Sequence, residues 1–124
     1  MERTMIKDLP SKENSQVEIK GWVDTIREHG KLIFLEIRDI TGTVQTLTTA
    51  KDETNFEIAK SLSKESCIRI KGEVKPRPEG TQNKDSPAGT VEIKISELDE
   101  KVKITLESIQ KNLFKKAQKN LFEN

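Results

Sequence analysis

The sequence predicts a mainly β fold: a small barrel of five strands, with one helix between the third and fourth strands and an amphipathic helix at the C-terminus. Two observations predict it. Short segments rich in β-branched residues recur with turn residues between them, which is the spacing of a small sandwich or barrel. A single segment with helical periodicity interrupts this series. The chain of 124 residues has room for one domain and an appendage.

The first three strands form a predicted meander. Residues 17–24 alternate between apolar and polar side chains, as a half-buried strand does. Residues 31–38 follow the turn residues 28–30, which gives a hairpin. A second turn at residues 39–42 leads into a third strand at residues 43–49.

The second half of the chain supplies the helix and two more strands. Residues 52–62 place four apolar side chains near one helical face, with Thr54 as the expected N-cap. Residues 66–74 and 90–98 are predicted strands, and the Pro/Gly-rich loop 75–89 between them cannot sustain regular structure. The order β-β-β-α-β-β is that of the OB-fold, whose second and third strands bind oligonucleotides.

Composition excludes several classes of protein. With 32% hydrophobic and 35% charged residues, the chain is globular and very soluble, and its net charge of +1 argues against nucleic-acid binding by bulk electrostatics. The longest apolar stretch, residues 32–35, is far too short to span a membrane, and the N-terminus has no signal-like segment. We therefore expect a cytoplasmic protein. Cys67, the only cysteine, can form neither an internal disulfide nor a cysteine zinc site, and we expect a buried thiol.

No catalytic signature stands out. The single histidine, His29, lies in a predicted turn, there is no Gly-rich phosphate loop, and the carboxylates have no recognisable spacing. We expect a chain that is not an enzyme by itself and that needs neither a cofactor nor a metal.

Residues 21–45, GWVDTIREHGKLIFLEIRDITGTVQ, contain the informative motifs: Gly-Trp-Val, Arg-x-His-Gly, Arg-Asp and Gly-x-Val-Gln. This block resembles the N-terminal anticodon-binding domain of aspartyl-tRNA synthetase, of the class II aspartyl, asparaginyl and lysyl group. The resemblance covers roughly residues 15–98 and includes the loop NKDSPAG before a strand with Glu92. The resemblance implies an RNA-binding module that recognises a GU(C/U) anticodon in aspartate tRNA, with asparagine tRNA as a second candidate. The family's catalytic domain is a candidate partner.

Phe34 and Gln45 match the family residues that recognise the central anticodon uracil. The resemblance implies that Phe34 stacks on this base, which contributes about 1–3 kcal/mol. Alternation supports an exposed ring, because Phe34 shares its strand face with Glu36 while Ile33, Leu35 and Ile37 share the other. The alternative interpretation of Phe34 is a core residue. Gln45 offers both a donor and an acceptor to the uracil edge, and its alternative is an exposed residue at a strand end.

The resemblance assigns RNA contacts to six further residues. Arg27 matches an arginine beside the anticodon loop, and Glu92 matches a guanine reader whose carboxylate accepts the N1 and N2 protons. Their alternatives are an ordinary turn residue and a solvated strand residue. His29 lies near the third anticodon base in this family and would influence which of the two tRNAs is accepted. The remaining three are predicted helpers for the outer bases and phosphates: Lys75, Arg77 and Asn83.

The C-terminal tail differs in character from the barrel. We divide the chain into an OB-fold domain at residues 1–104 and a helical tail at 105–124 that repeats KNLF and has an apolar stripe. Packing on the barrel is the simplest role for the stripe, with homo-oligomerisation or docking on a partner as alternatives. Two other functions stay open: a general single-stranded nucleic-acid OB protein, and a protein-interaction module that uses this tail. The tail also favours a free-standing protein over an excised domain.

Overall fold

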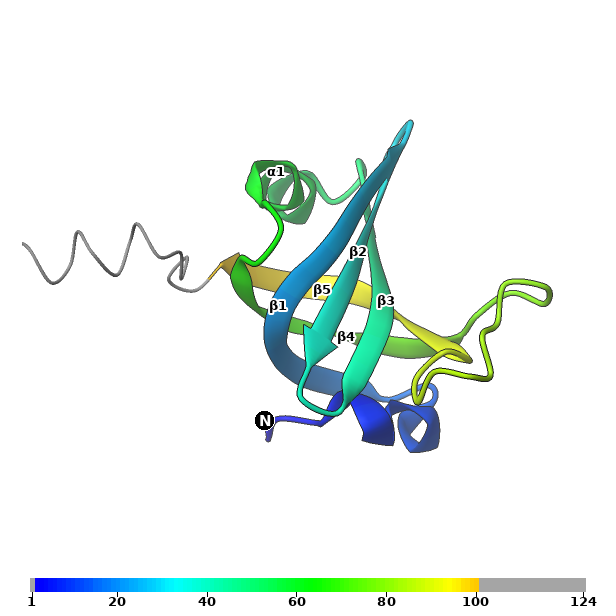
Figure 1. Cartoon of the computed structure of the whole chain (residues 1–124). Coiled ribbons are helices and arrows are strands. Elements are labelled where there is room, and N and C mark those ends of the chain that lie inside the picture. The colour runs from blue at the N-terminus through cyan, green and yellow to red at the C-terminus, as the bar shows by residue number, and fades with distance from the viewer. Residues whose placement is uncertain (1, 101–124) are drawn as a thin grey trace, which may run out of the picture.

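The computed structural model describes residues 2–100, which form a closed five-stranded barrel with one α-helix and a short 3-10 helix (Figure 1). Around the barrel the strands lie in the order β1-β2-β3-β5-β4, and β1 closes the barrel by pairing with β4. All pairs are antiparallel except β3 with β5. The elements are η1 (Ile6–Lys12), β1 (Gln16–His29), β2 (Leu32–Asp39), β3 (Gly42–Thr49), α1 (Glu53–Ser61), β4 (Cys67–Pro76) and β5 (Val91–Glu100).

The predicted OB-fold order β-β-β-α-β-β is therefore confirmed within residues 2–100. The predicted C-terminal helix at 105–124 and the domain boundary at 104 lie outside the described residues.

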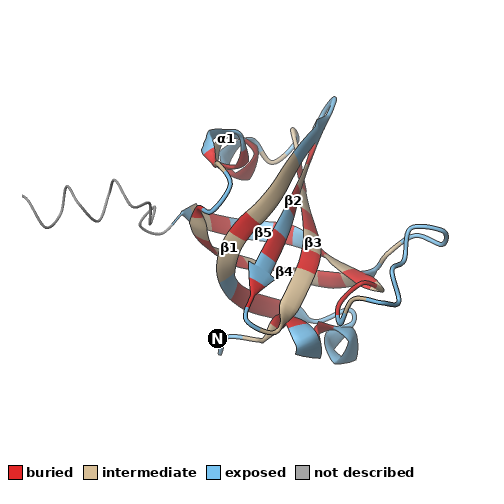
Figure 2. Cartoon of the chain, in the orientation of Figure 1, coloured by how far each residue is buried: buried red, intermediate tan, exposed pale blue. Residues whose placement is uncertain are grey.

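Alternation along each strand builds the core, as the banding in Figure 2 illustrates. On β2 the side chains of Ile33, Leu35 and Ile37 are each 0% exposed, whereas Phe34 is half-buried and Glu36 exposed on the outer face. The prediction that Phe34 lies on the side away from the Ile/Leu core is confirmed. Burial of the inward row removes apolar surface from water, the main stabilising contribution to a small barrel.

The first strand is longer than predicted. It continues past residue 24 to His29, with a bulge between Val23 and Thr25. Alternation before the bulge puts Val23 in the core with Val17 and Ile19 and puts Trp22 on the outside, where the Arg38 guanidinium lies 5.4 Å from the indole ring. Trp22 therefore packs on the outer surface of the barrel.

Gly21 lies where β1 and β2 approach each other closely. A Cβ at this position would lie 2.3 Å from the carbonyl oxygen of Arg38 on β2, so only glycine fits without a backbone shift.

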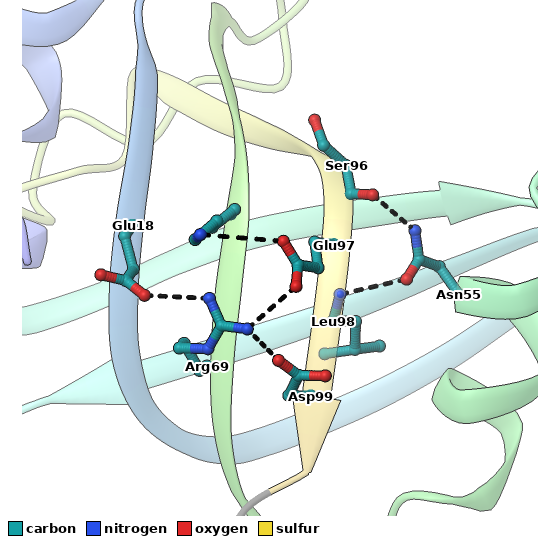
Figure 3. Close-up of polar contacts among 8 residues, drawn as sticks. Glu18, Asn55, Arg69, Ser96, Glu97, Leu98 and Asp99 are labelled. Carbon is teal, nitrogen blue, oxygen red and sulfur yellow. Dashed lines mark hydrogen bonds and ion pairs between the residues drawn. The ribbon is translucent and has the colours of Figure 1, made fainter. Parts of the chain in front are cut away.

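The N-cap prediction for the helix was wrong by two residues. Asp52 caps α1 by accepting a hydrogen bond from the Asn55 backbone N–H, and Thr54 lies exposed within the first turn. An aspartate preceding the first helical residue satisfies the free N–H groups there, so the cap falls at Asp52. The buried Asn55 also fixes α1 to β5: its amide donates to the Ser96 carbonyl at 2.9 Å and accepts from the Leu98 N–H at 3.0 Å (Figure 3).

The outer face of β1, β4 and β5 is neutralised by its own ion pairs. Arg69 of β4 lies between Glu18 of β1 and two carboxylates of β5, Glu97 and Asp99 (Figure 3). Its hydrogen bond holds the pKa of Glu18 below the usual range. The Arg69 guanidinium on this face is already paired with carboxylates of the protein itself.

On the same outer face, Cys67 lies opposite Trp22 and is half-buried, so the prediction of a buried thiol was wrong.

The sequence did not predict the 3-10 helix η1, which lies across one end of the barrel (Figure 1). Its Ile6 and Leu9 are fully buried. Asp39, only 3% exposed at the end of β2, connects it to the barrel by accepting hydrogen bonds from the Ile6 N–H at 3.0 Å and from the Thr41 N–H at 2.7 Å. A third bond comes from the Thr41 hydroxyl at 2.6 Å. Asp39 thus holds both η1 and the β2–β3 turn in place.

Candidate nucleic-acid interface

Five of the eight predicted site residues form one connected group on the outer face of β1, β2, β3 and β5. Phe34 lies at its centre. Arg27 pairs with Phe34 in the β1–β2 ladder, and its guanidinium carbon is 5.3 Å from the centre of the Phe34 ring. The imidazole of His29 meets the same ring edge-on, with 6.0 Å between the ring centres. These two neighbours fix the ring on a surface that it shares with polar groups.

A hydrogen-bonded chain connects this aromatic group to β5. The Arg27 guanidinium donates to the Gln45 Oε1 at 3.0 Å, and the Gln45 Nε2 donates to the Glu92 Oε1 at 3.1 Å. Gln45 and Glu92 are direct partners in the parallel β3–β5 ladder, which explains why residues so distant in sequence meet. The amide oxygen of Gln45 therefore points to the Arg27 guanidinium, and the amide nitrogen points to the Glu92 carboxylate. One N–H and one lone pair of this amide stay available to a ligand.

The surface can recognise an unstacked base. Single-stranded bases bind by stacking on aromatic rings and by hydrogen bonds to their edges. Phe34 supplies the ring, Gln45 a donor and an acceptor, and Glu92 two acceptor oxygens. Arg27, which is exposed, adds a planar cation suited to a phosphate or a base edge. The group thus combines stacking with both kinds of hydrogen-bonding partner.

The other three predicted residues lie outside this hydrogen-bonded chain. Lys75 is the ladder partner of Glu92 on β4, but its ammonium group lies 3.3 Å from a Glu73 oxygen and 3.3 Å from the Asn14 amide oxygen. Arg77 is half-buried at the start of the loop that leads to β5. Its backbone N–H donates to the Thr90 carbonyl at 2.9 Å, and its Nε is buried without a hydrogen-bond partner among the described residues.

Asn83 organises the loop itself. Its Oδ1 accepts from the Asp85 N–H at 3.1 Å, and its N–H donates to the Gly89 carbonyl at 2.8 Å. A Cβ on Gly89 would overlap the Asn83 carbonyl oxygen, so this contact requires glycine. The geometry of Asn83 is that of a residue that shapes the loop beside Glu92.

Sequence reasoning overlooked a continuation of this face. Leu47 lies two residues beyond Gln45 on β3, and Lys94 two residues beyond Glu92 on β5. These two residues are ladder partners, and Leu47 also pairs with Phe34. The alternation that placed Phe34 outside could have identified both, since residues two apart on a strand share a face.

Residues 2–100 contain no helix that is long and apolar enough to cross a membrane. Within the same range, no three His, Cys, Asp or Glu side chains are grouped closely enough to hold a metal ion.

Comparisons with known proteins agree with this geometry. A family model named for the tRNA anticodon and described as an OB-fold nucleic acid binding domain matches residues 17–111. The chain is 40% identical over 93 residues to an aspartate–tRNA(Asp/Asn) ligase of Salinibacter ruber, a match that spans 73% of this chain and 15% of the relative. A similar ligase of a Methylobacterium species is 39% identical over 90 residues.

Solved structures give the same result. The asparaginyl-tRNA synthetase of Pyrococcus horikoshii, complexed with asparaginyl-adenylate, is 31% identical with a TM-score of 0.69, over 85% of this chain and 23% of that protein. An aspartyl-tRNA synthetase of Entamoeba histolytica shares the fold at 22% identity, with a TM-score of 0.73 over 98% of this chain and 27% of that protein. The closed barrel and a family model that matches most of the chain lead to the same conclusion. The chain belongs to the family of OB-fold nucleic acid binding domains.

Proposed function

We propose that this chain binds the anticodon loop of aspartate tRNA and recognises a GU(C/U) anticodon, with asparagine tRNA as a second candidate ligand of the same site. The observation that carries the proposal is the chain of contacts from Phe34 through Arg27 and Gln45 to Glu92. The similarity to aspartate–tRNA(Asp/Asn) ligases supports it.

In the proposed complex each residue has a separate task. Phe34 stacks on the central uracil, and Gln45 uses its remaining N–H and lone pair to read the edge of the same base. Glu92 accepts the N1 and N2 protons of guanine, an arrangement that offsets the repulsion between a carboxylate and RNA. Arg27 holds a phosphate or a base edge beside the ring. We propose that His29, which packs against Phe34, influences the choice of the third base.

The proposed contribution of this chain is binding rather than catalysis. The chain spans 15% of the length of the curated relatives that it matches. We infer that attachment of the amino acid requires a synthetase catalytic domain, which is the proposed partner. Lys75, Arg77 and Asn83 remain proposed helpers at the loop end of the site, with Asn83 acting through the shape of the loop.

A general single-stranded nucleic-acid binder is less well supported. Such proteins stack successive bases on several aromatic rings. On the outer face of residues 2–100, Phe34 lies beside the polar group of Arg27, Gln45 and Glu92, whereas Trp22 pairs with Arg38 and Cys67, outside this group. One stacking ring next to a fixed amide and a carboxylate suits base recognition better than sequence-independent tracking of a strand.

Replacing Glu92 with glutamine tests the guanine contact. We expect Glu92→Gln to reduce the preference for a GUC anticodon stem-loop over an AUC stem-loop by roughly tenfold, since a bidentate base contact contributes about 1–3 kcal/mol of discrimination. The measurement is the ratio of the two dissociation constants at one fixed salt concentration. Glu57→Gln, on the exposed side of α1, is the matched control. An unchanged ratio in Glu92→Gln would refute the role of Glu92 as guanine reader.

A further inference from the structure

A cavity lies on the same outer face, next to the proposed base-reading residues. It has a volume of about 360 Å³, and its lining consists of Lys31, Leu32, Thr49, Ala50, Lys51 and Lys94. Leu32 pairs with Thr49 in the β2–β3 ladder, and the next outward-facing pair along the strands is Phe34 with Leu47. Outward-facing neighbours on one strand are about 7 Å apart. The cavity is therefore one position away from the ring that is proposed to stack on the central base.

The cavity combines an apolar floor with a cationic rim. Leu32 and Ala50 supply the apolar surface of the cavity. The volume of the cavity is within the range of small-molecule sites, roughly 300–1,000 Å³. None of its three lysines forms an ion pair with another residue of the range 2–100, whereas Lys60, Lys71 and Lys75 each lie within 4.0 Å of a carboxylate. Asp52, which follows Lys51 directly, is occupied as the cap of α1.

These two properties are complementary to one class of ligand. An apolar floor accepts the face of a base, and unpaired ammonium groups accept a phosphate. Lysine acts as a point charge and carries no information about sequence, so such a site adds affinity without selecting a base. This division of labour differs from that of Gln45 and Glu92, whose amide and carboxylate discriminate between base edges.

We propose that this cavity is a nucleotide subsite that holds a nucleotide flanking the anticodon on the same RNA strand, with its phosphate bound by Lys31, Lys51 and Lys94. The inference rests on the proposed function and extends it from the three anticodon bases to the adjoining backbone. The RNA then runs along β2 and β3, from the Glu92 end of the face past Phe34 to the cavity at the start of α1.

The test compares two triple variants of the full chain. One replaces the cavity lysines (Lys31→Ala, Lys51→Ala and Lys94→Ala), and the control replaces three exposed lysines that do not line the cavity (Lys7→Ala, Lys20→Ala and Lys64→Ala). Each variant loses the same formal charge, and thermal melting checks that both stay folded. The probes are an anticodon stem-loop with GUC and the same stem-loop with its central base changed, each titrated at several salt concentrations.

We expect the cavity variant to bind the GUC stem-loop about tenfold or more weakly than the control variant. The slope of log K against log salt should become shallower by about 0.7 for each phosphate that the protein no longer neutralises. The ratio between the two stem-loops should stay at the wild-type value. Affinity and slope equal to those of the control would overturn the subsite, as would a collapse of the ratio, which would make the lysines part of base reading. Absence of any preference in the wild-type chain would instead overturn the proposed function.

Discussion

Replacing Phe34 with alanine is expected to weaken binding of a GUC anticodon stem-loop by about 1–3 kcal/mol, roughly 5- to 150-fold, because the base loses its stacking partner. The ring also positions Arg27 and His29, which contact it directly. Dissociation constants from a fluorescence titration at near-physiological salt would measure the loss.

The matched variant Phe34→Leu separates stacking from simple apolar contact. Leucine keeps most of the apolar volume on this half-buried position but has no aromatic face. We expect it to melt close to the wild type and to bind RNA nearly as weakly as Phe34→Ala. RNA affinity at the wild-type level in both variants would place the stacking contact elsewhere.

Replacing Asp39 with alanine is expected to lower the free energy of unfolding by about 3 kcal/mol at neutral pH. The carboxylate accepts three hydrogen bonds, and its loss leaves the N–H of the buried Ile6 without a partner. Hydrogen bonds to charged groups contribute roughly 1.5–3 kcal/mol each, and a buried unsatisfied donor costs about 1–3 kcal/mol. Urea unfolding of wild type, Asp39→Ala and Asp39→Asn would measure the difference. Asparagine keeps one acceptor oxygen and should fall between the other two proteins.

The same residue has a predictable pH dependence. Burial disfavours the charge on Asp39, but the hydrogen bonds from Thr41 and Ile6 outweigh it and lower its pKa below the usual value of 3.8. Its contribution is therefore complete above 3.8 and is lost as pH falls through the lower folded pKa. The stability gap between wild type and Asp39→Ala should narrow in acid. A gap that stays constant from neutral pH to below the folded pKa of Asp39 would show that the charge of Asp39 has no part in it.

Much of the fold follows from patterns that a single sequence contains. Alternation in residues 31–38 gave both the strand and the face of Phe34, because a β-strand has a period of two. The 3-10 helix η1 has no such period and contains Pro10. Its place depends on Asp39, a contact across 33 positions of sequence that no local pattern contains.

The bulge in β1 is a second feature that could not be predicted from the sequence pattern. The alternation of residues 17–24 predicted a strand that ends too early. The extra residue between Val23 and Thr25 shifts the pairing with β2, and the strand then continues to His29. A bulge depends on the partner strand, so alternation alone does not reveal it.

For the candidate site, too, the sequence pointed to single residues but not to the contacts between them. Resemblance to a known family identified Arg27, Phe34, Gln45 and Glu92 one by one, whereas the chain of contacts among them depends on the parallel pairing of β3 with β5. The lysine-rimmed cavity was not predicted, because Lys31, Lys51 and Lys94 come from three segments that meet only in the folded barrel.

The central claim is that the face around Phe34 reads an anticodon. The most direct measurement is a titration of the chain, at one near-physiological salt concentration, with an aspartate tRNA, the same tRNA with its central anticodon uridine replaced, and an unrelated tRNA. We predict clear preference for the intact GUC anticodon over both of the others. Equal affinity for all three tRNAs would contradict anticodon reading and leave a general nucleic-acid binder, and no binding to any of them would contradict RNA recognition by this chain on its own.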